Sequence, residues 1–136
     1  MSVVVDTPIW SEFFRRQRPD KLVSEKLQEA IEAGEAVLLG PIRQEILSGI
    51  RDPKQFTKLG SALRAFPDLP LETADYERAA SYFNQCRASG IQGSNSDFLI
   101  CAVAHRLSAE ILTLDNDFDL FAAILPIQLT RFASGT

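Results

Sequence analysis

Five acidic residues follow predicted strands or lie near the start of predicted helices: Asp6, Glu45, Asp97, Asp115 and Asp117. Asp6 comes directly after the β-branched run 3–5, and Asp115 and Asp117 come directly after the apolar run 111–114. In a parallel sheet, functional side chains gather beyond the carboxyl ends of the strands. We therefore expect these carboxylates to meet at one edge of a sheet.

The surroundings of two of these acids favour a metal site. Asp6 and Asp97 are flanked by apolar residues, and no lysine or arginine is close to either in the sequence. A carboxylate in such surroundings is costly unless a positive or hydrogen-bonding group compensates it, and converging carboxylates raise one another's pKa. Oxygen ligands without histidine or cysteine suit Mg²⁺ or Mn²⁺. The pattern indicates metal-assisted hydrolysis of a phosphodiester.

Each acid taken alone has a simpler interpretation. A carboxylate near a helix N-terminus is stabilised by about 0.3–1 kcal/mol through the helix dipole. Capping is the better explanation for any single position, and only the combination of all of them favours a shared site.

Other catalytic chemistries find little support in the composition. The single histidine, His105, lies in an apolar segment and is expected to be structural, since one imidazole cannot build a histidine-rich zinc site. The two cysteines, Cys86 and Cys101, show no CxxC spacing and are expected to be reduced, buried apolar residues.

Length and composition predict one globular domain over residues 1–136. The hydrophobic content is 46% and the charged content 24%, which argues against a disordered or fibrous chain. No apolar run approaches the roughly 18 residues of a membrane helix, and the first residues lack the features of a signal peptide. We expect a cytoplasmic protein that does not associate with membranes.

The charge distribution gives no clear sign of nucleic-acid binding. The formal net charge is −4, and residues 1–68 hold ten basic and ten acidic residues against four and eight in the remainder. Phosphate contacts usually need a basic surface. Basic residues do cluster over 15–26 and 43–64, where solvated helix faces are the simpler explanation and a positive rim around an acidic pocket the alternative.

Short apolar runs alternate with helical patterns along the chain, which is typical of a parallel sheet covered by helices. We expect an α/β fold of three layers (α/β/α) with a short parallel sheet of about four to five strands. The predicted strands are 3–5, 36–39, 111–114 and 127–129. The first predicted helix begins near Pro8, and further helices are predicted over 20–33, 41–50, 53–66, 97–107 and 118–123. Thr73 is predicted to cap one more helix, and residues 94–96 are candidate caps for the helix that begins at 97.

Four segments resemble, in order, the motifs of the PIN domain family, and are most similar to its VapC-type toxins: 3–7, 45–49, 96–102 and 112–118. Any one of them is weak because an Asp after a strand is common, but together they span residues 2 to about 130. The resemblance places the family's acidic quartet on Asp6, Glu45, Asp97 and Asp115, with Asp117 as a fifth metal ligand. Thr7 and Thr113 would be supporting residues, the hydroxyl of Thr113 orienting a carboxylate or a phosphate.

The resemblance implies an endoribonuclease dependent on Mg²⁺, with Mn²⁺ as a possible replacement. It would cut structured RNA of the tRNA or rRNA class, with a metal-activated water as the nucleophile, and be inhibited by a small cognate antitoxin similar to VapB. VapC toxins commonly form homodimers. Trp10, Phe13, Phe14, Phe56 and Leu59 are candidates for a groove that accepts an antitoxin helix or a second copy, although core packing explains them at least as well.

Two alternatives remain open. One is a non-catalytic PIN-like module that binds RNA or protein, but such a module has no reason to keep four mutually repelling carboxylates. The other is a phosphoryl-transfer or receiver-type domain. A phosphatase would need a second Asp where Pro8 stands, and a receiver would need a late lysine that the chain lacks.

Overall fold

The computed structural model describes residues 1–15 and 21–130. Four short strands form one parallel sheet in the order β2-β1-β3-β4. They are β1 (Val3–Val5), β2 (Ala36–Val37), β3 (Glu110–Leu112) and β4 (Gln128–Leu129). Val4 is paired with Val37 on one side and Ile111 on the other, so β1 lies inside the sheet, and Val4 and Val5 are both fully buried. The predicted α/β fold with a short parallel sheet is confirmed.

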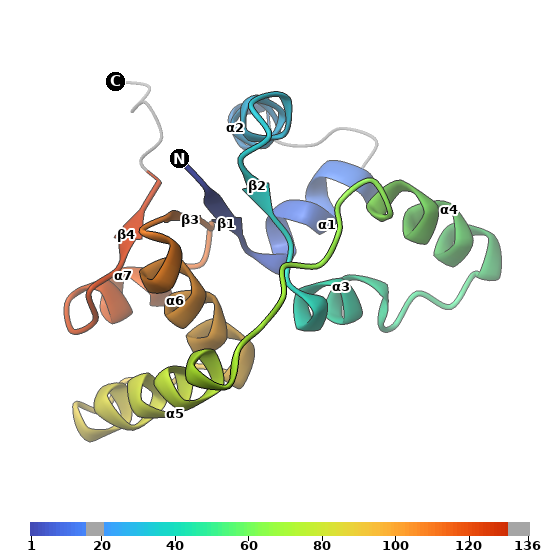
Figure 1. The fold of residues 1–136 in the computed structure, drawn as a ribbon. Helices are drawn as coiled ribbons and strands as arrows, with labels where there is room; N and C mark the ends of the chain where they lie inside the picture. Colours follow the sequence, from blue (N-terminus) through green and yellow to red (C-terminus); the bar gives the residue numbers. More distant parts are fainter. Residues whose placement is uncertain (16–20, 131–136) are drawn as a thin grey trace.

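Helices connect and cover the strands: α1 (Thr7–Arg15), α2 (Lys21–Glu32), α3 (Gly40–Leu47), α4 (Pro53–Leu63), α5 (Thr73–Ala88), α6 (Asn95–Leu107) and α7 (Asp117–Ala122). In the view of Figure 1, α5 and α6 lie together at the lower left, and α1, α3 and α4 lie together at the right. Helix α6 packs against β1, β3 and α5, and every residue from 98 to 104 in it is buried. This explains the nearly continuous apolar sequence of α6, whose first turn carries Asp97.

Several predicted boundaries are wrong by a few residues. Helix α3 ends at Leu47 rather than 50, because Ser48 is extended and Gly49 has a φ of 86°. Helix α4 ends at Leu63 rather than 66, since Pro67 disfavours a helical conformation at the preceding residue. The start of the predicted helix 20–33 lies outside the described residues.

Two other predictions need correction. Glu72, not Thr73, is the N-cap of α5, where it forms a capping box with Asp75. His105, expected to be structural, is exposed on α6, and no hydrogen bond from its ring is found among the described residues. The two cysteines are free and buried, as predicted. None of the helices in the described ranges is long and apolar enough to cross a membrane.

Two arginines fix the segment 64–72, which runs from α4 across to α5 in Figure 1. Arg43 on α3 donates to Asp68 Oδ1 at 2.8 Å and to the carbonyl oxygens of Leu63 and Phe66. Leu69 N donates to Leu38 O at 3.0 Å, so the segment also pairs with the residue that directly follows β2. The second arginine, Arg106, holds the far end of the segment.

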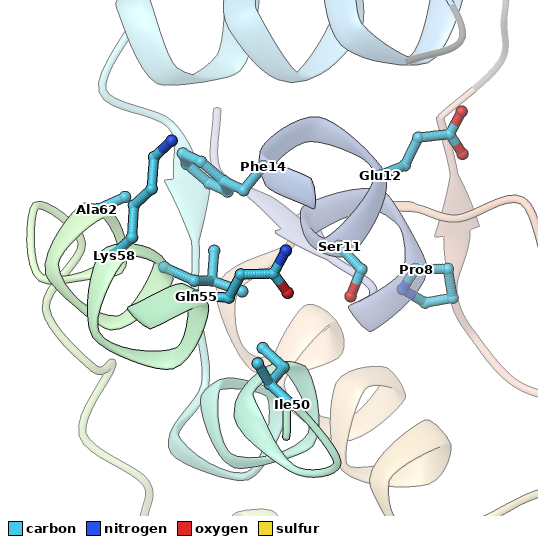
Figure 2. Close-up of a pocket in the computed structure, with 9 residues that line it drawn as sticks. Pro8, Ser11, Glu12, Phe14, Ile50, Gln55, Lys58 and Ala62 are labelled. Atoms are coloured by element: carbon cyan, nitrogen blue, oxygen red, sulfur yellow. The ribbon is translucent and has the colours of Figure 1, made fainter. Parts of the chain in front are cut away.

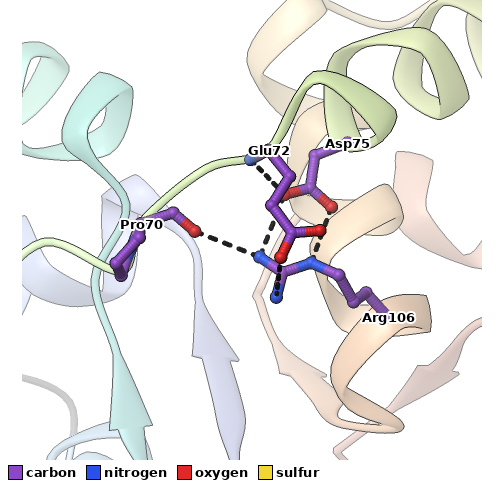
Figure 3. A network of polar contacts seen from close by, with 4 residues as sticks. All are labelled: Pro70, Glu72, Asp75 and Arg106. Atoms are coloured by element: carbon purple, nitrogen blue, oxygen red, sulfur yellow. Dashed lines mark hydrogen bonds and ion pairs between the residues drawn. The ribbon is translucent and has the colours of Figure 1, made fainter.

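Arg106 on α6 forms the network drawn in Figure 3. Its guanidinium donates to both carboxylate oxygens of Asp75, at 2.8 and 2.9 Å, and to Pro70 O at 3.2 Å. Glu72 completes the network as a longer ion pair of 3.6 Å. These contacts fix the start of α5 against α6.

Candidate active site

Asp6 lies where β1 passes into α1, and its side chain is 5% exposed. Its Oδ1 accepts a hydrogen bond from Thr7 N, and its Oδ2 accepts one from the hydroxyl of Thr113, both at 2.8 Å. Asp6 N also donates to Leu112 O, so the parallel pairing of β1 and β3 brings the ends of the two strands together. The orientation of this carboxylate is therefore fixed by both strands.

A continuous hydrogen-bonded chain extends from Asp6 to the loop after β3. Asp115 N donates to the Thr113 hydroxyl oxygen at 3.0 Å, and Asp117 N donates to Asp115 Oδ1 at 2.9 Å. Asp115 and Asp117 are both exposed. The Thr113 hydroxyl thus contacts both Asp6 and the loop that carries Asp115.

Asp97 is held in a capping box at the start of α6. Ser94 N donates to Asp97 Oδ2 at 3.0 Å, and Asp97 N donates to the Ser94 hydroxyl oxygen at 3.1 Å. One carboxylate oxygen of Asp97 is engaged in this cap, and the other accepts no hydrogen bond from the described residues. Capping and a second role are therefore compatible at this position.

The electrostatics connect these acids. Burial raises the pKa of Asp6 to about 6, against the lowering effect of its hydrogen bonds to Thr113 and Thr7, and the charges of Asp97 and Asp115 add to the rise. Burial also raises the pKa of Asp97, with smaller contributions from the charges of Asp115 and Asp117. Among the described residues, no lysine or arginine forms an ion pair with any of these four acids. They therefore form an uncompensated acidic cluster.

Glu45 lies apart from this cluster in its contacts. It stands in the second turn of α3, is exposed, and is not among the charges that shift the pKa of Asp6 or Asp97. The structure thus brings Asp6, Asp97, Asp115 and Asp117 into electrostatic contact and does not include Glu45 in that group.

The acidic cluster suits a hard divalent cation by its donor chemistry. All its side-chain donors are carboxylate oxygens, and each oxygen of Asp6 keeps a lone pair beyond the hydrogen bond it accepts. Within residues 1–15 and 21–130, however, no three acidic, histidine or cysteine side chains are already close enough together to enclose an ion. Binding of a cation would have to draw the carboxylates closer together.

A separate groove of about 640 Å³ lies between α1, α4 and the loop after α3, as Figure 2 shows. Its lining is mostly apolar, with one acid and one lysine: Pro8, Ser11, Glu12, Phe14, Ile50, Gln55, Lys58, Leu59 and Ala62. Of the five residues predicted for such a groove, Phe14 and Leu59 line it. Trp10 does not, because it is fully buried, donates from its indole nitrogen to Val5 O, and packs against Phe66.

Asp75 is a structural acid that sequence analysis missed. It is 2% exposed and accepts two hydrogen bonds from Arg106, so it is a buried, paired acid. Its partner is 31 residues away, and the only local signal is its position three residues after Glu72, which is the spacing of a capping box.

Comparison with known proteins identifies the family. Residues 3–124 match the family model described as "PIN domain". Two curated relatives, the VapC ribonuclease Mb1587 of Mycobacterium bovis and ribonuclease VapC11 of Mycobacterium tuberculosis, are each 33% identical over 132 residues. The alignment covers 96% of this chain and 98% of each relative.

Solved structures share the fold at lower identity. FitAcB from Neisseria gonorrhoeae superposes with a TM-score of 0.75 at 20% identity, covering 94% of this chain and 96% of the other. VapBC2 from Rickettsia felis, bound to a promoter DNA fragment, superposes with a TM-score of 0.74 at 15% identity, covering 96% and 98%.

Proposed function

This chain belongs to the PIN domain family, with VapC ribonucleases as its curated relatives, and from that membership we propose that it is a metal-dependent endoribonuclease and the toxin of a VapBC-type toxin–antitoxin pair. One observation supports the catalytic part above others. Asp6 is a buried carboxylate with a raised pKa, no cationic partner among the described residues, and two further acids acting on it. Without a function, such an arrangement would only destabilise the fold.

We assign the ion to Asp6, Asp97 and Asp115, with Asp117 as an additional ligand. A bound Mg²⁺ or Mn²⁺ would supply Lewis-acid activation of water and charge stabilisation at the phosphate. Thr7 N and the Thr113 hydroxyl hold the Asp6 carboxylate in one orientation, and Ser94 does the same for Asp97. Glu45 remains part of the proposal as an exposed acid that would reach the ion or the substrate through a movement of its side chain.

The proposed substrate is structured RNA of the tRNA or rRNA class. The proposed location of the protein is the cytoplasm. The class of RNA comes from the family resemblance, and the location is the expectation drawn from the composition of the sequence. The acidic cluster itself is suited to a phosphodiester of either kind of RNA.

The antitoxin partner is proposed to occupy the groove between α1 and α4. Its apolar lining around Phe14, Ile50 and Leu59 fits the apolar face of a helix, and Glu12 and Lys58 lie at its rim in Figure 2. Substitution of Ala62, an exposed residue that lines the groove, by Glu, tested in a pull-down with the antitoxin encoded by the neighbouring reading frame, should abolish capture without reducing RNA cleavage. Unchanged capture would place the antitoxin elsewhere.

The catalytic proposal is tested by incubating purified protein with total RNA over a titration of Mn²⁺ and of Mg²⁺. EDTA and the Asp97→Asn variant serve as controls. Discrete products that depend on the metal and are absent with the variant would support the proposal. Retained RNA binding without any metal-dependent product would favour the second candidate, a non-catalytic RNA-binding module.

A further inference from the structure

A second, smaller hollow of about 230 Å³ lies where the end of α5 meets the start of α6. It is lined by Phe83 and Arg87 from α5, by Ile91, Gln92 and Gly93 from the loop, and by Phe98 from α6. The proposed reaction has so far used none of these residues.

Two residues that line this hollow are sequence neighbours of the capping box that holds Asp97. Gly93 immediately precedes Ser94, which is hydrogen-bonded to Asp97, and Phe98 immediately follows Asp97. The wall of the hollow and the capping box of the acid are thus made of consecutive residues. A phosphate held near Asp97 would leave the neighbouring nucleotide next to the hollow.

The floor of the hollow is rigid. Phe98 is 1% exposed, and its ring packs against Phe83 at 5.6 Å between centroids and against Phe121 at 4.8 Å. A Cβ added to Gly93 would come within 2.6 Å of the Phe121 ring and 3.0 Å of the Phe98 ring, so the loop backbone lies directly on these aromatic side chains. The hollow is therefore a fixed feature of the packing.

Its charge distinguishes it from the rest of the acidic half of the chain. The basic residues between 69 and 130 are Arg78, Arg87 and Arg106. Arg106 forms ion pairs with Asp75 and Glu72, and the charge of Arg78 helps to lower the pKa of Asp75. Within this described stretch Arg87 alone has no acidic partner, and it is exposed at the hollow. Its guanidinium is suited to binding a phosphate through two hydrogen bonds.

We propose that this hollow is a subsite for the nucleotide next to the cleaved phosphodiester, with Arg87 on its phosphate. The base would lie against Phe83 and Ile91, and the Gln92 amide, which both donates and accepts hydrogen bonds, would contact the base edge. This inference rests on the proposed ribonuclease function and adds a specificity determinant to it. In this subsite Arg87 provides a positive charge for binding RNA, although the chain as a whole has a net charge of −4.

The test compares Arg87→Gln with Arg78→Gln, a matched loss of charge on the same helix outside the hollow. Steady-state cleavage of a short RNA should show the KM of Arg87→Gln raised about tenfold with kcat within about twofold of wild type. The KM of Arg87→Lys should lie between those of wild type and Arg87→Gln, because lysine keeps the charge without the paired donors. Gln92→Ala should change the base preference next to the cut in a randomised RNA pool.

A second measurement separates failure of this inference from failure of the proposed function. Nucleoside monophosphates are titrated into wild-type protein and Arg87→Gln while the amide NMR signals of residues 91–93 are followed. Shifts that are lost in Arg87→Gln support the subsite even if no RNA is cleaved. Equal KM values for the two glutamine variants, or no shifts at 91–93 in wild type, would overturn it.

Discussion

At the residue scale, the distinctive feature is the buried carboxylate of Asp6, which pairs with no lysine or arginine of the described part of the chain. Removal of its charge should separate stability from activity. Asp6→Asn keeps the shape of the side chain and one carbonyl oxygen that can accept from Thr7 N, while its NH2 group can donate to the Thr113 hydroxyl oxygen in place of the bond that Asp6 accepts. The substitution removes the negative charge. We expect RNA cleavage to be lost while the circular dichroism spectrum is unchanged. Wild-type cleavage by this variant would show that Asp6 is not part of the active site.

The same residue predicts an unusual dependence of stability on pH. The pKa of Asp6 is about 6 in the folded chain against 3.8 unfolded, so the folded state binds more protons between these values and loses stability as the pH rises. At about 1.4 kcal/mol per unit of pKa, the loss is at most about 3 kcal/mol by pH 7. The raised pKa of Asp97 acts in the same direction.

Urea unfolding in EDTA of wild type and Asp6→Asn isolates this effect from other titrating groups. The two proteins should be about equally stable at pH 4, and the variant should be more stable at pH 7. Saturating Mg²⁺ should reverse the order at pH 7, since only wild type would gain stability by binding it. A constant difference across this pH range would contradict the shifted pKa.

Thr113 is predicted to act through its hydroxyl, which donates to Asp6 and accepts from Asp115 N. Thr113→Val keeps the shape and removes both contacts, so we expect cleavage or metal affinity to fall about 10- to 100-fold, as for other residues that orient metal ligands. Thr113→Ser keeps the hydroxyl and serves as the control. Equal losses in both variants would indicate that the methyl group matters rather than the hydrogen bonds.

At the scale of elements, the sequence predicted what depends on local pattern. The strand 3–5 and the buried helix α6 follow from β-branching and apolar composition, and the N-cap of α6, Ser94, is one of the three candidates that capping chemistry offered at 94–96. The ends of α3 and α4 were placed three residues too far, because apolar periodicity continues at Ile50 and Phe66, which pack on the core from outside the helices.

The acidic cluster was predictable because parallel strands bring their carboxyl ends to one edge. The exposed position of Glu45, the exclusion of Trp10 from the groove and the pairing of Asp75 with Arg106 depend on contacts between distant segments. Sequence patterns contain no information on these distances. The homodimer and the single domain over residues 1–136 stay predictions.

The arginines that fix the segment 64–72 allow a comparison of two ion pairs with the same geometry. Arg106–Asp75 and Arg43–Asp68 both have an Nε to Oδ1 distance of 2.8 Å, but the Asp75 side chain is 2% exposed and that of Asp68 is 51% exposed. We expect Asp75→Ala to lower the free energy of unfolding by about 2–3 kcal/mol, because it leaves a cation and several donors without their acceptor. Asp68→Ala should cost less than about 1 kcal/mol.

Urea unfolding at pH 7 measures both variants. The contribution of Asp75 should also disappear in acid. Burial alone would raise its pKa, but the hydrogen bonds from Arg106 and Glu72 N lower it below 3.8, so the stabilisation is present above that value and is lost as the pH falls through the folded pKa. Similar losses for the two alanine variants would mean that burial does not set the strength of these pairs.

At the scale of the whole molecule, a net charge of −4 limits how the chain can hold RNA. Arg43 and Arg106 are used inside the fold, so binding should depend on a divalent cation at the acidic cluster and on a few phosphate contacts such as that proposed for Arg87.

Anisotropy of a labelled RNA in Ca²⁺ should give an affinity that falls only about as the second power of KCl concentration, because each phosphate contact on a single strand contributes about 0.7 to the slope. EDTA should weaken binding strongly. A salt slope of about four or more that EDTA does not change, and that Lys54→Gln or Lys58→Gln reduces, would instead assign RNA binding to the lysines of α4. Because Lys58 lines the α1–α4 groove, that result would also argue against the antitoxin role proposed for the groove.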